Sequence, residues 1–104
     1  MELGITTKHT PECYLIKVSG EVDISNADKL RTAINRAMDE TAEEVRLDFA
    51  EVGYIDSTGI GVLVGAAQSA GERAKRFSVV RAQPTVMRVA QLLGVDKEIN
   101  ITAA

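Results

Sequence analysis

Apolar and polar side chains alternate along several short stretches of the chain. Within 13–19 and 45–49 apolar residues recur at every second position, as in strands that bury one face. A weaker stretch over 3–8, followed by the turn signal of Thr10-Pro11-Glu12, predicts an opening hairpin. The strands expected from this pattern are 3–8, 13–19, 45–49, 77–81 and a last one that includes Ile99 and Ile101.

The 3.6-residue period of a helix first appears after the short, acidic segment 20–24. Its start resembles a capping box over 25–28, in which Ser25 caps the helix and Asp28 reaches back. This helix should end near Glu40. The positions expected to face the core are Ala27, Leu30, Ile34, Ala37 and Met38.

Two further helices are predicted. One begins near Ser57 and ends around Gly71. The other begins at Pro84, where a proline loses no needed N–H, and ends at Gly94, which is placed for a left-handed cap. The expected core positions are Ile60, Leu63, Val64, Ala67 and Ala70 in the first helix and Val86, Val89, Ala90 and Leu93 in the second.

The order of these elements predicts the fold class. A hairpin is followed by alternating helices and strands, with no internal repeat and no linker. Right-handed crossovers between the strands would make much of the sheet parallel. We therefore expect residues 1–104 to form a single α/β domain, in which helices pack on a mixed, largely parallel β-sheet.

Composition and charge exclude several classes of function. The net charge is −3 and the Lys and Arg residues are scattered, which argues against a nucleic-acid partner. No apolar run is long enough to cross a membrane and no signal-peptide pattern opens the chain, so we expect a cytoplasmic protein. Cys13, the only cysteine, is expected in the core and not as a reactive thiol.

The strand-to-helix joint within 54–65 has the strongest candidate chemistry. Asp56, Ser57 and Thr58 are all favoured N-cap residues, so the Ser57 hydroxyl should lie at the positive end of a helix dipole. A phosphate there adds roughly −1.5 to −2 charges beside unpaired backbone donors. Phosphorylation could then change what binds at this position without changing the fold.

Small residues continue along the helix beyond this serine. Gly61 and Gly65 lie one and two turns from Ser57, and Ser69 lies a third. Each interior glycine costs about 1 kcal/mol relative to alanine, which calls for an explanation. Two explanations are open: the small residues pack closely inside the domain, or they give a partner access to Ser57.

Enzyme chemistry fits the residues less well. Asp56-Ser57-Thr58-Gly59 has one residue too many for the Asp-Ser/Thr-Gly motif of retroviral aspartic proteases, and the following helical pattern contradicts their all-β fold. A serine hydrolase would need a Gly-X-Ser-X-Gly elbow and a catalytic histidine, whereas the only histidine, His9, is expected as an exposed strand residue. No Cys/His cluster predicts a metal site, and no motif predicts a cofactor.

Over essentially its whole length the chain resembles the anti-sigma factor antagonists built on the STAS domain. Three motifs carry this resemblance: Gly20-Glu21-Val22-Asp23, Leu47-Asp48-Phe49 and the specific signature Tyr54-Ile55-Asp56-Ser57-Thr58-Gly59-Ile60-Gly61-Val62. The signature differs from the family only in detail. Ile60 replaces the commoner Leu, and Thr58 stands where many members have a second Ser.

The resemblance implies a phosphorylation switch and not an enzyme. In the family, the serine after the Asp, here Ser57, is phosphorylated by an anti-sigma factor that is also an ATP-dependent serine kinase. The unphosphorylated form binds the anti-sigma factor and frees the sigma factor, and a metal-dependent serine phosphatase restores this form. The residues expected at the partner interface are Asp23, Asp56, Ser57, Thr58, Gly59, Gly61, Val62 and Gly65.

Alternatives to these roles remain. Asp56 could serve only as a helix cap, and Asp23 could serve only to close a turn. The whole domain could also be a passive STAS module for interaction or scaffolding in a larger signalling assembly. A serine after the Asp favours the switch, because a passive module need not keep a phosphorylatable residue there.

Overall fold

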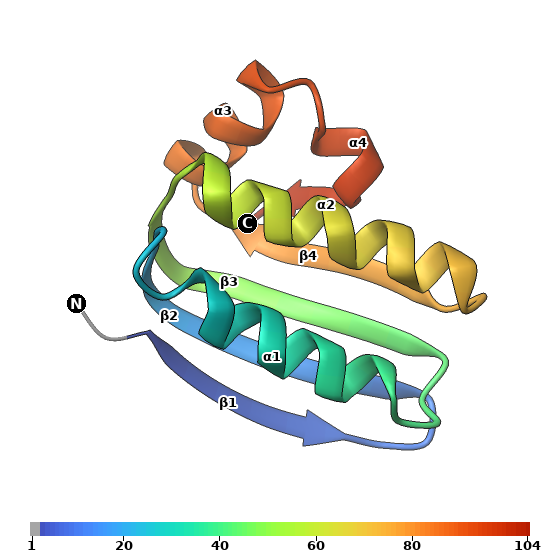
Figure 1. Cartoon of the computed structure of the whole chain (residues 1–104). Helices are drawn as coiled ribbons and strands as arrows, with labels where there is room; N and C mark the ends of the chain where they lie inside the picture. Colours follow the sequence, from blue (N-terminus) through green and yellow to red (C-terminus); the bar gives the residue numbers. More distant parts are fainter. Residues whose placement is uncertain (1–2) are drawn as a thin grey trace.

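The computed structural model describes residues 3–104 as a five-stranded sheet with helices on one side (Figure 1). The strands are β1 (Gly4–His9), β2 (Cys13–Val22), β3 (Glu44–Ile55), β4 (Arg76–Ala82) and β5 (Ile101–Ala103). The helices are α1 (Ala27–Met38), α2 (Ser57–Glu72), α3 (Pro84–Leu92) and α4 (Asp96–Ile99). The predicted α/β class is confirmed.

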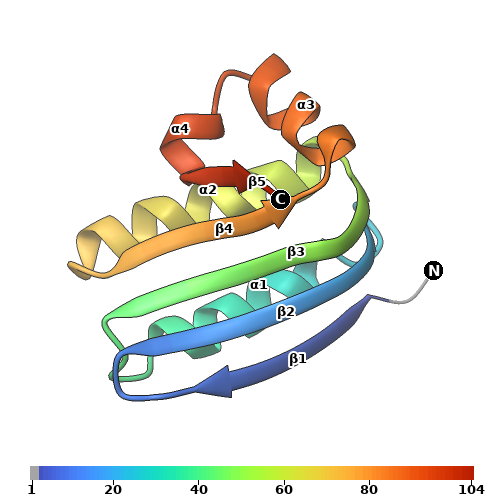
Figure 2. The same cartoon turned by 180° about the vertical axis from the view of Figure 1, so that it is seen from behind.

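The sheet is mixed and largely parallel, as predicted. Its strands follow the order β1-β2-β3-β4-β5; β1 pairs antiparallel with β2, and every later pair is parallel. Because β2, β3 and β4 follow one another in the same direction, right-handed crossovers put both α1 and α2 on the same face. Figure 2 shows that the opposite face of the sheet carries no helix.

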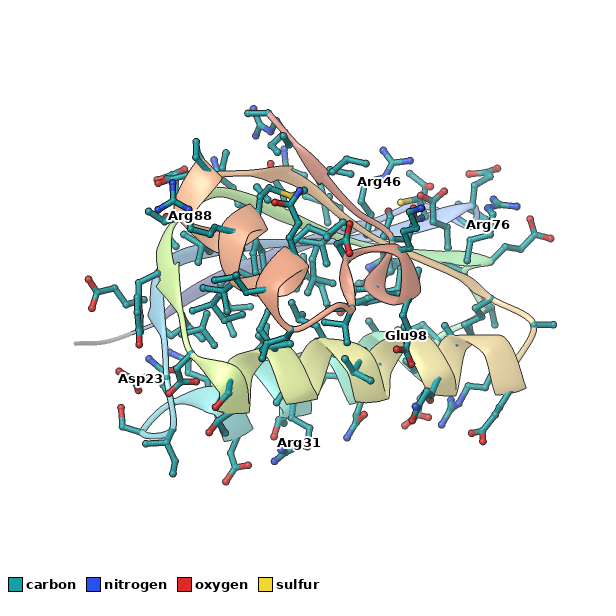
Figure 3. All side chains as sticks on the ribbon, turned by 90° about the horizontal axis from the view of Figure 1, so that it is seen from above. Asp23, Arg31, Arg46, Arg76, Arg88 and Glu98 are labelled. Carbon is teal, nitrogen blue, oxygen red and sulfur yellow. The ribbon has the colours of Figure 1, made fainter. Side chains whose placement is uncertain are left out.

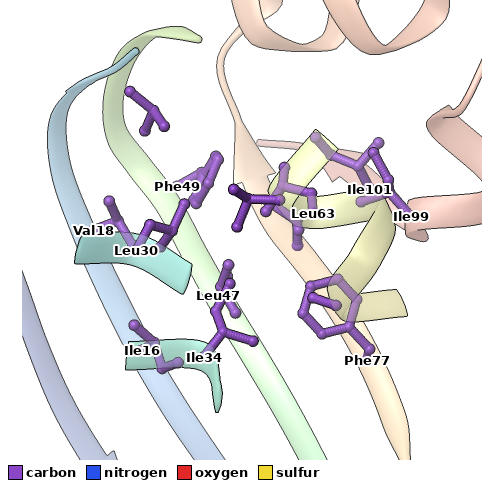
Figure 4. Packing of buried hydrophobic residues seen from close by; sticks show 14 of the residues in the cluster. Ile16, Val18, Leu30, Ile34, Leu47, Phe49, Leu63, Phe77, Ile99 and Ile101 are labelled. Carbon is purple, nitrogen blue, oxygen red and sulfur yellow. The ribbon is translucent and has the colours of Figure 1, made fainter. Parts of the chain in front are cut away.

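The hydrophobic core fills the space between the sheet and the helices (Figure 4). Leu30 and Ile34 of α1 and Leu63 of α2 pack side by side against the same face of the sheet. All three are almost fully buried. Strand residues on this face include Tyr14, Ile16 and Val18 of β2 and Val45, Leu47 and Phe49 of β3, as their alternation predicts.

Two strands are longer than the alternation predicts. The segment 50–53 was expected as a loop, but it continues β3. The reason is that β2 extends past Gly20 to Val22, and this part of β2 pairs with β3 as far as Ile55. Irregularities in the pairing lie between Lys17 and Ser19 and beyond Gly20, which has φ of 109°. These irregularities break the two-residue period, so the pattern hides the strand.

The expected capping box of α1 is wrong. Asn26 is the N-cap residue and makes no side-chain cap bond, while Asp28 forms an ion pair with Arg31. Ser25 donates both its N–H and its hydroxyl to the Asp23 carboxylate, so its oxygen is engaged in the loop and does not accept from the helix.

The starts and ends of the later helices agree better with expectation. Pro84 begins α3, and Gly94 has a left-handed φ of 73° beyond its end. Leu93, however, is half exposed instead of buried. In α2 the core face includes Val62 and Ala66 in place of the expected Val64 and Ala67, which are only partly buried. Ile99 ends the unexpected helix α4 and is not in the last strand.

Cys13 lies on the helix-free face of the sheet, half-buried, and the prediction that it belongs to the core is wrong. Burial raises the pKa of its thiol above the ordinary value. His9 is exposed, as predicted, and its ring stacks on that of Tyr14 with a centroid separation of 5.1 Å.

In the described residues no helix is both long and apolar enough to cross a membrane. Within the same residues, no three metal-binding side chains gather in one place.

Candidate functional site: the start of helix α2

Asp56 is the cap of α2. It has an extended conformation, with φ of −99° and ψ of −178°, and its Oδ1 accepts a hydrogen bond of 2.9 Å from the backbone N–H of Gly59. The side chain that caps the helix therefore belongs to Asp56, and Ser57 is the first helical residue. Ser57 is exposed to solvent, while Thr58 is half-buried.

The same carboxylate joins α2 to the loop between β2 and α1. Oδ2 of Asp56 accepts from the backbone N–H of Ile24 at 3.1 Å, and the backbone N–H of Asp56 donates to the carbonyl of Val22 at 3.1 Å. The backbone and the side chain of Asp56 therefore both hold the loop. The loop that carries Asp23 is therefore brought next to Ser57, although more than thirty residues separate them in the sequence.

Hydrogen bonds within the loop fix its shape. The side chain of Asn26 donates to the carbonyl of Glu21 at 2.7 Å and accepts from the backbone N–H of Asp23 at 2.9 Å. The hydroxyl and backbone N–H of Ser25 hold the pKa of the Asp23 carboxyl below its ordinary value. Asp23 therefore keeps its negative charge at neutral pH. Figure 3 shows it at the end of the sheet where α2 begins.

The glycines of α2 divide into two kinds. A Cβ on Gly59 would lie 2.6 Å from Cγ1 of Ile55 and 2.7 Å from Cγ1 of Val22, so this glycine is needed for close packing. A Cβ on Gly61 or Gly65 would meet nothing within 4 Å, and both residues are exposed. Of the two explanations left open by the sequence, internal packing is therefore wrong for Gly61 and Gly65.

These two exposed glycines line a groove between α1 and α2. Its volume is about 220 Å³, and its walls are formed by Arg31, Ile34, Asn35, Gly61, Val62, Gly65 and Ala66. Val62 is only 5% exposed, so it contributes to the floor of the groove and presents little surface to a partner. Arg31, which is paired with Asp28, lines the groove on the side of α1.

The structure thus gathers the predicted site residues in two ways. Asp56 and Ser57 lie at the start of α2, where the loop of Asp23 is bonded to Asp56, and Gly61 and Gly65 line the groove farther along the helix. Gly59 and Val62 are buried and support this surface from beneath. The predicted structural roles of Asp56 as a cap and Asp23 in a turn are both confirmed.

Sequence reasoning missed two residues beside this site. Nothing local in the sequence indicates that Arg31 borders a groove between α1 and α2. Ile24 ends the short, acidic segment 20–24, and the sequence pattern assigned it no role. Its side chain is 78% exposed.

The chain is similar to known proteins over nearly its whole length. A family model described as the STAS domain matches residues 4–104. An anti-sigma-B factor antagonist of Listeria monocytogenes is 33% identical over 102 residues, which cover 97% of this chain and 90% of that protein.

Solved structures of similar proteins share the fold. An anti-sigma factor antagonist from Mycobacterium paratuberculosis has a TM-score of 0.88 at 23% identity, covering 99% of this chain and 87% of that chain. The anti-sigma factor antagonist SpoIIAA in its unphosphorylated form has a TM-score of 0.81 at 23% identity, covering 97% and 88%. The Bacillus protein SpoIIAA in its phosphorylated form has a TM-score of 0.74 at 22% identity, covering 97% and 91%.

Because the family model spans nearly the whole chain and the Listeria relative matches it from end to end, this protein belongs to the STAS domain family, as a relative of the anti-sigma factor antagonists.

Proposed function

We propose that this chain is an anti-sigma factor antagonist that phosphorylation of Ser57 switches off. In the unphosphorylated state it binds an anti-sigma factor, which is also an ATP-dependent serine kinase, and the sigma factor is released. A metal-dependent serine phosphatase reverses the modification. The exchange takes place in the cytoplasm, with neither nucleic acid nor membrane as a partner.

One observation carries this proposal: Ser57 is exposed at the first turn of α2, and the cap of that helix comes from Asp56 instead. The serine hydroxyl can therefore be modified without loss of the cap. A phosphate at this position stays close to the helix N-terminus, whose partial positive charge favours an anion. The fold should accept the modification. The similarity of fold to SpoIIAA, solved in both forms, supports this expectation.

Charge explains how phosphorylation would weaken docking. Asp56 directly precedes Ser57, and its hydrogen bond to Ile24 brings the loop that carries the Asp23 carboxylate to this end of α2. A phosphate on Ser57 adds roughly −1.5 to −2 charges there. Covering this charged, strongly hydrated surface with a partner costs more desolvation free energy than covering the unphosphorylated surface, so binding is weaker. The two exposed glycines of the groove, by contrast, let a partner approach the backbone of α2 closely.

Binding of two Ser57 variants tests the switch. Ser57→Ala should keep the fold and bind the anti-sigma factor constitutively, because it cannot be phosphorylated. Ser57→Asp should bind poorly, because it adds a permanent negative charge. Titration of each variant against the purified anti-sigma factor kinase encoded nearest to this protein measures both affinities. Equal affinity of the two variants would rule out the switch and favour a passive STAS module.

Mass spectrometry assigns the modified residue. After incubation with ATP and the same kinase, intact mass and peptide mapping should find one phosphate, located on Ser57. Ser57→Ala should carry no phosphate, and Thr58→Ala serves as the matched control that still accepts one. Phosphate on Thr58 in the unsubstituted protein would contradict the assignment.

A further inference from the structure

Ile24 is an apolar side chain held out in solvent by a rigid loop. Its exposed fraction is 78%, although the residues on either side of the loop, Val22 and Ala27, are buried. An exposed isoleucine by itself is common on protein surfaces and calls for no explanation. The unusual feature is how firmly the backbone beneath it is fixed.

Three side chains fix that backbone. The Asp56 carboxylate accepts the N–H of Ile24 itself at 3.1 Å. Asn26 bridges the loop by bonding to the carbonyl of Glu21 and the N–H of Asp23, and the Asp23 carboxylate accepts from the N–H of Ser25. An apolar side chain on a preorganised backbone loses little conformational freedom when a partner covers it.

The position of Ile24 indicates which partner would cover it. Its N–H is bonded to the residue that immediately precedes Ser57, so a partner that covers the phosphorylation site also reaches this loop. Its neighbours Asp23, Ser25 and Asn26 are polar. Protein interfaces usually have an apolar centre within a polar rim, and Ile24 with these neighbours has that arrangement.

We propose that Ile24 is an apolar anchor that the anti-sigma factor kinase covers when it binds the start of α2. This inference rests on the proposed function and adds a specificity residue to it. Charge on Ser57 acts on the same contact, because the Asp56 carboxylate joins the two positions. Phosphorylation of Ser57 therefore places a hydrated charge near Ile24 and opposes the burial of its side chain by the partner.

The chain offers a matched control at the end of α3. Leu92 is also 78% exposed, and it is the last residue of α3, whereas Ile24 lies in the loop before α1. Ile24→Ala and Leu92→Ala therefore remove apolar side chains of equal exposure. Both variants should keep the unfolding temperature of the unsubstituted protein, since neither side chain packs in the core.

Affinity for the unphosphorylated protein is the deciding measurement. Calorimetric titration with the anti-sigma factor kinase encoded nearest to this protein should show binding at least about tenfold weaker for Ile24→Ala. Leu92→Ala should bind as the unsubstituted protein does. Ile24→Leu, which keeps the apolar surface, should recover most of the affinity.

The outcomes separate this inference from the proposed function. If Ser57→Asp loses binding but Ile24→Ala binds as tightly as the unsubstituted protein, the switch stands and the anchor is wrong. Equal weakening of Ile24→Ala and Leu92→Ala would also overturn the anchor, because the effect would not depend on the site. If the unsubstituted protein binds no anti-sigma factor, both proposals fail together.

Discussion

At the scale of single residues, Asp56 and Ser57 divide two tasks that either could perform. The Asp56 carboxylate accepts from the N–H groups of Gly59 and Ile24, and so it both caps α2 and holds the neighbouring loop. Ser57, one residue later, is left exposed with its hydroxyl outside the cap. Two adjacent N-cap residues are therefore not redundant. Asp56 builds the site, and Ser57 is the residue that we propose is phosphorylated.

Gly59 gives a residue-scale prediction about packing. Gly59→Ala should destabilise the protein by about 1–3 kcal/mol, because the new methyl would press on Ile55 and Val22. Chemical denaturation measures the change in the free energy of unfolding. Gly71→Ala is the control in the same helix, since a Cβ there meets nothing within 4 Å. Equal stability of the two variants would contradict the packing role.

At the scale of elements, the contact between α1 and α2 forms the groove that we propose for docking. The exposed residues of α2 that line the groove are Gly61 and Gly65, which have no side chains to narrow it. Interior glycines weaken an isolated helix. Packing inside the domain does not require either glycine, which fits the proposed close approach of a partner.

Gly61→Ala should therefore have opposite effects on the stability of the fold and on the affinity for the partner. The substitution should stabilise the fold by about 0.5–1 kcal/mol, because alanine is the better helix former and has open space. Affinity for the anti-sigma factor kinase should nevertheless fall, since the methyl narrows the groove. Thermal unfolding and a binding titration on the same sample measure both effects.

Gly71→Ala provides the comparison for binding as well. It lies at the opposite end of α2 from Ser57, so it should gain stability without losing affinity. A Gly61→Ala protein that is more stable and binds unchanged would mean that this part of α2 does not contact the partner.

At the scale of the whole molecule, the helix-free face of the sheet is held by a partly buried ion pair. Asp48 of β3 is only 7% exposed and accepts from the Arg81 guanidinium, including a bond of 3.1 Å from Nε, and from the N–H of Ala50 at 3.0 Å. Arg81 has φ of 58°, where the pairing of β4 with β5 is interrupted. The pair therefore links β3 to the end of β4.

This pair predicts how stability depends on pH. The Arg81 guanidinium holds the pKa of the Asp48 carboxyl below its ordinary value, so the pair stabilises the fold above the unfolded pKa of about 3.9. That contribution is lost as the pH falls through the lower, folded pKa. Asp48→Asn should cost about 1–2 kcal/mol at pH 7 and progressively less below pH about 4.

Urea unfolding of both proteins between pH 3 and pH 7 measures this difference. Glu51→Gln, which removes an exposed partner of Lys17, is the control and should cost at most about 1 kcal/mol at any pH. If Asp48→Asn lowers the free energy of unfolding by the same amount at every pH in this range, the proposed role of the Asp48 charge is wrong.

The sequence by itself determined the class of fold, the order of most elements and the position of the candidate switch. These features depend on local chemistry: the spacing of apolar residues, the turn residues, and the N-cap residues around Ser57. The signature from Tyr54 to Val62 also sufficed to indicate the family, which the match over residues 4–104 bears out.

Only the tertiary structure decided the features that depend on neighbours in space. Gly59 and Gly61 look alike in the sequence, but Val22 and Ile55 press on one of them and nothing touches the other. Nothing in the sequence distinguishes Ile24 within the short segment 20–24, but a hydrogen bond to Asp56, 32 positions away, fixes its backbone while its side chain is in solvent. Local pattern places a residue on an element, and contacts between distant segments determine whether that residue packs, binds or is left exposed.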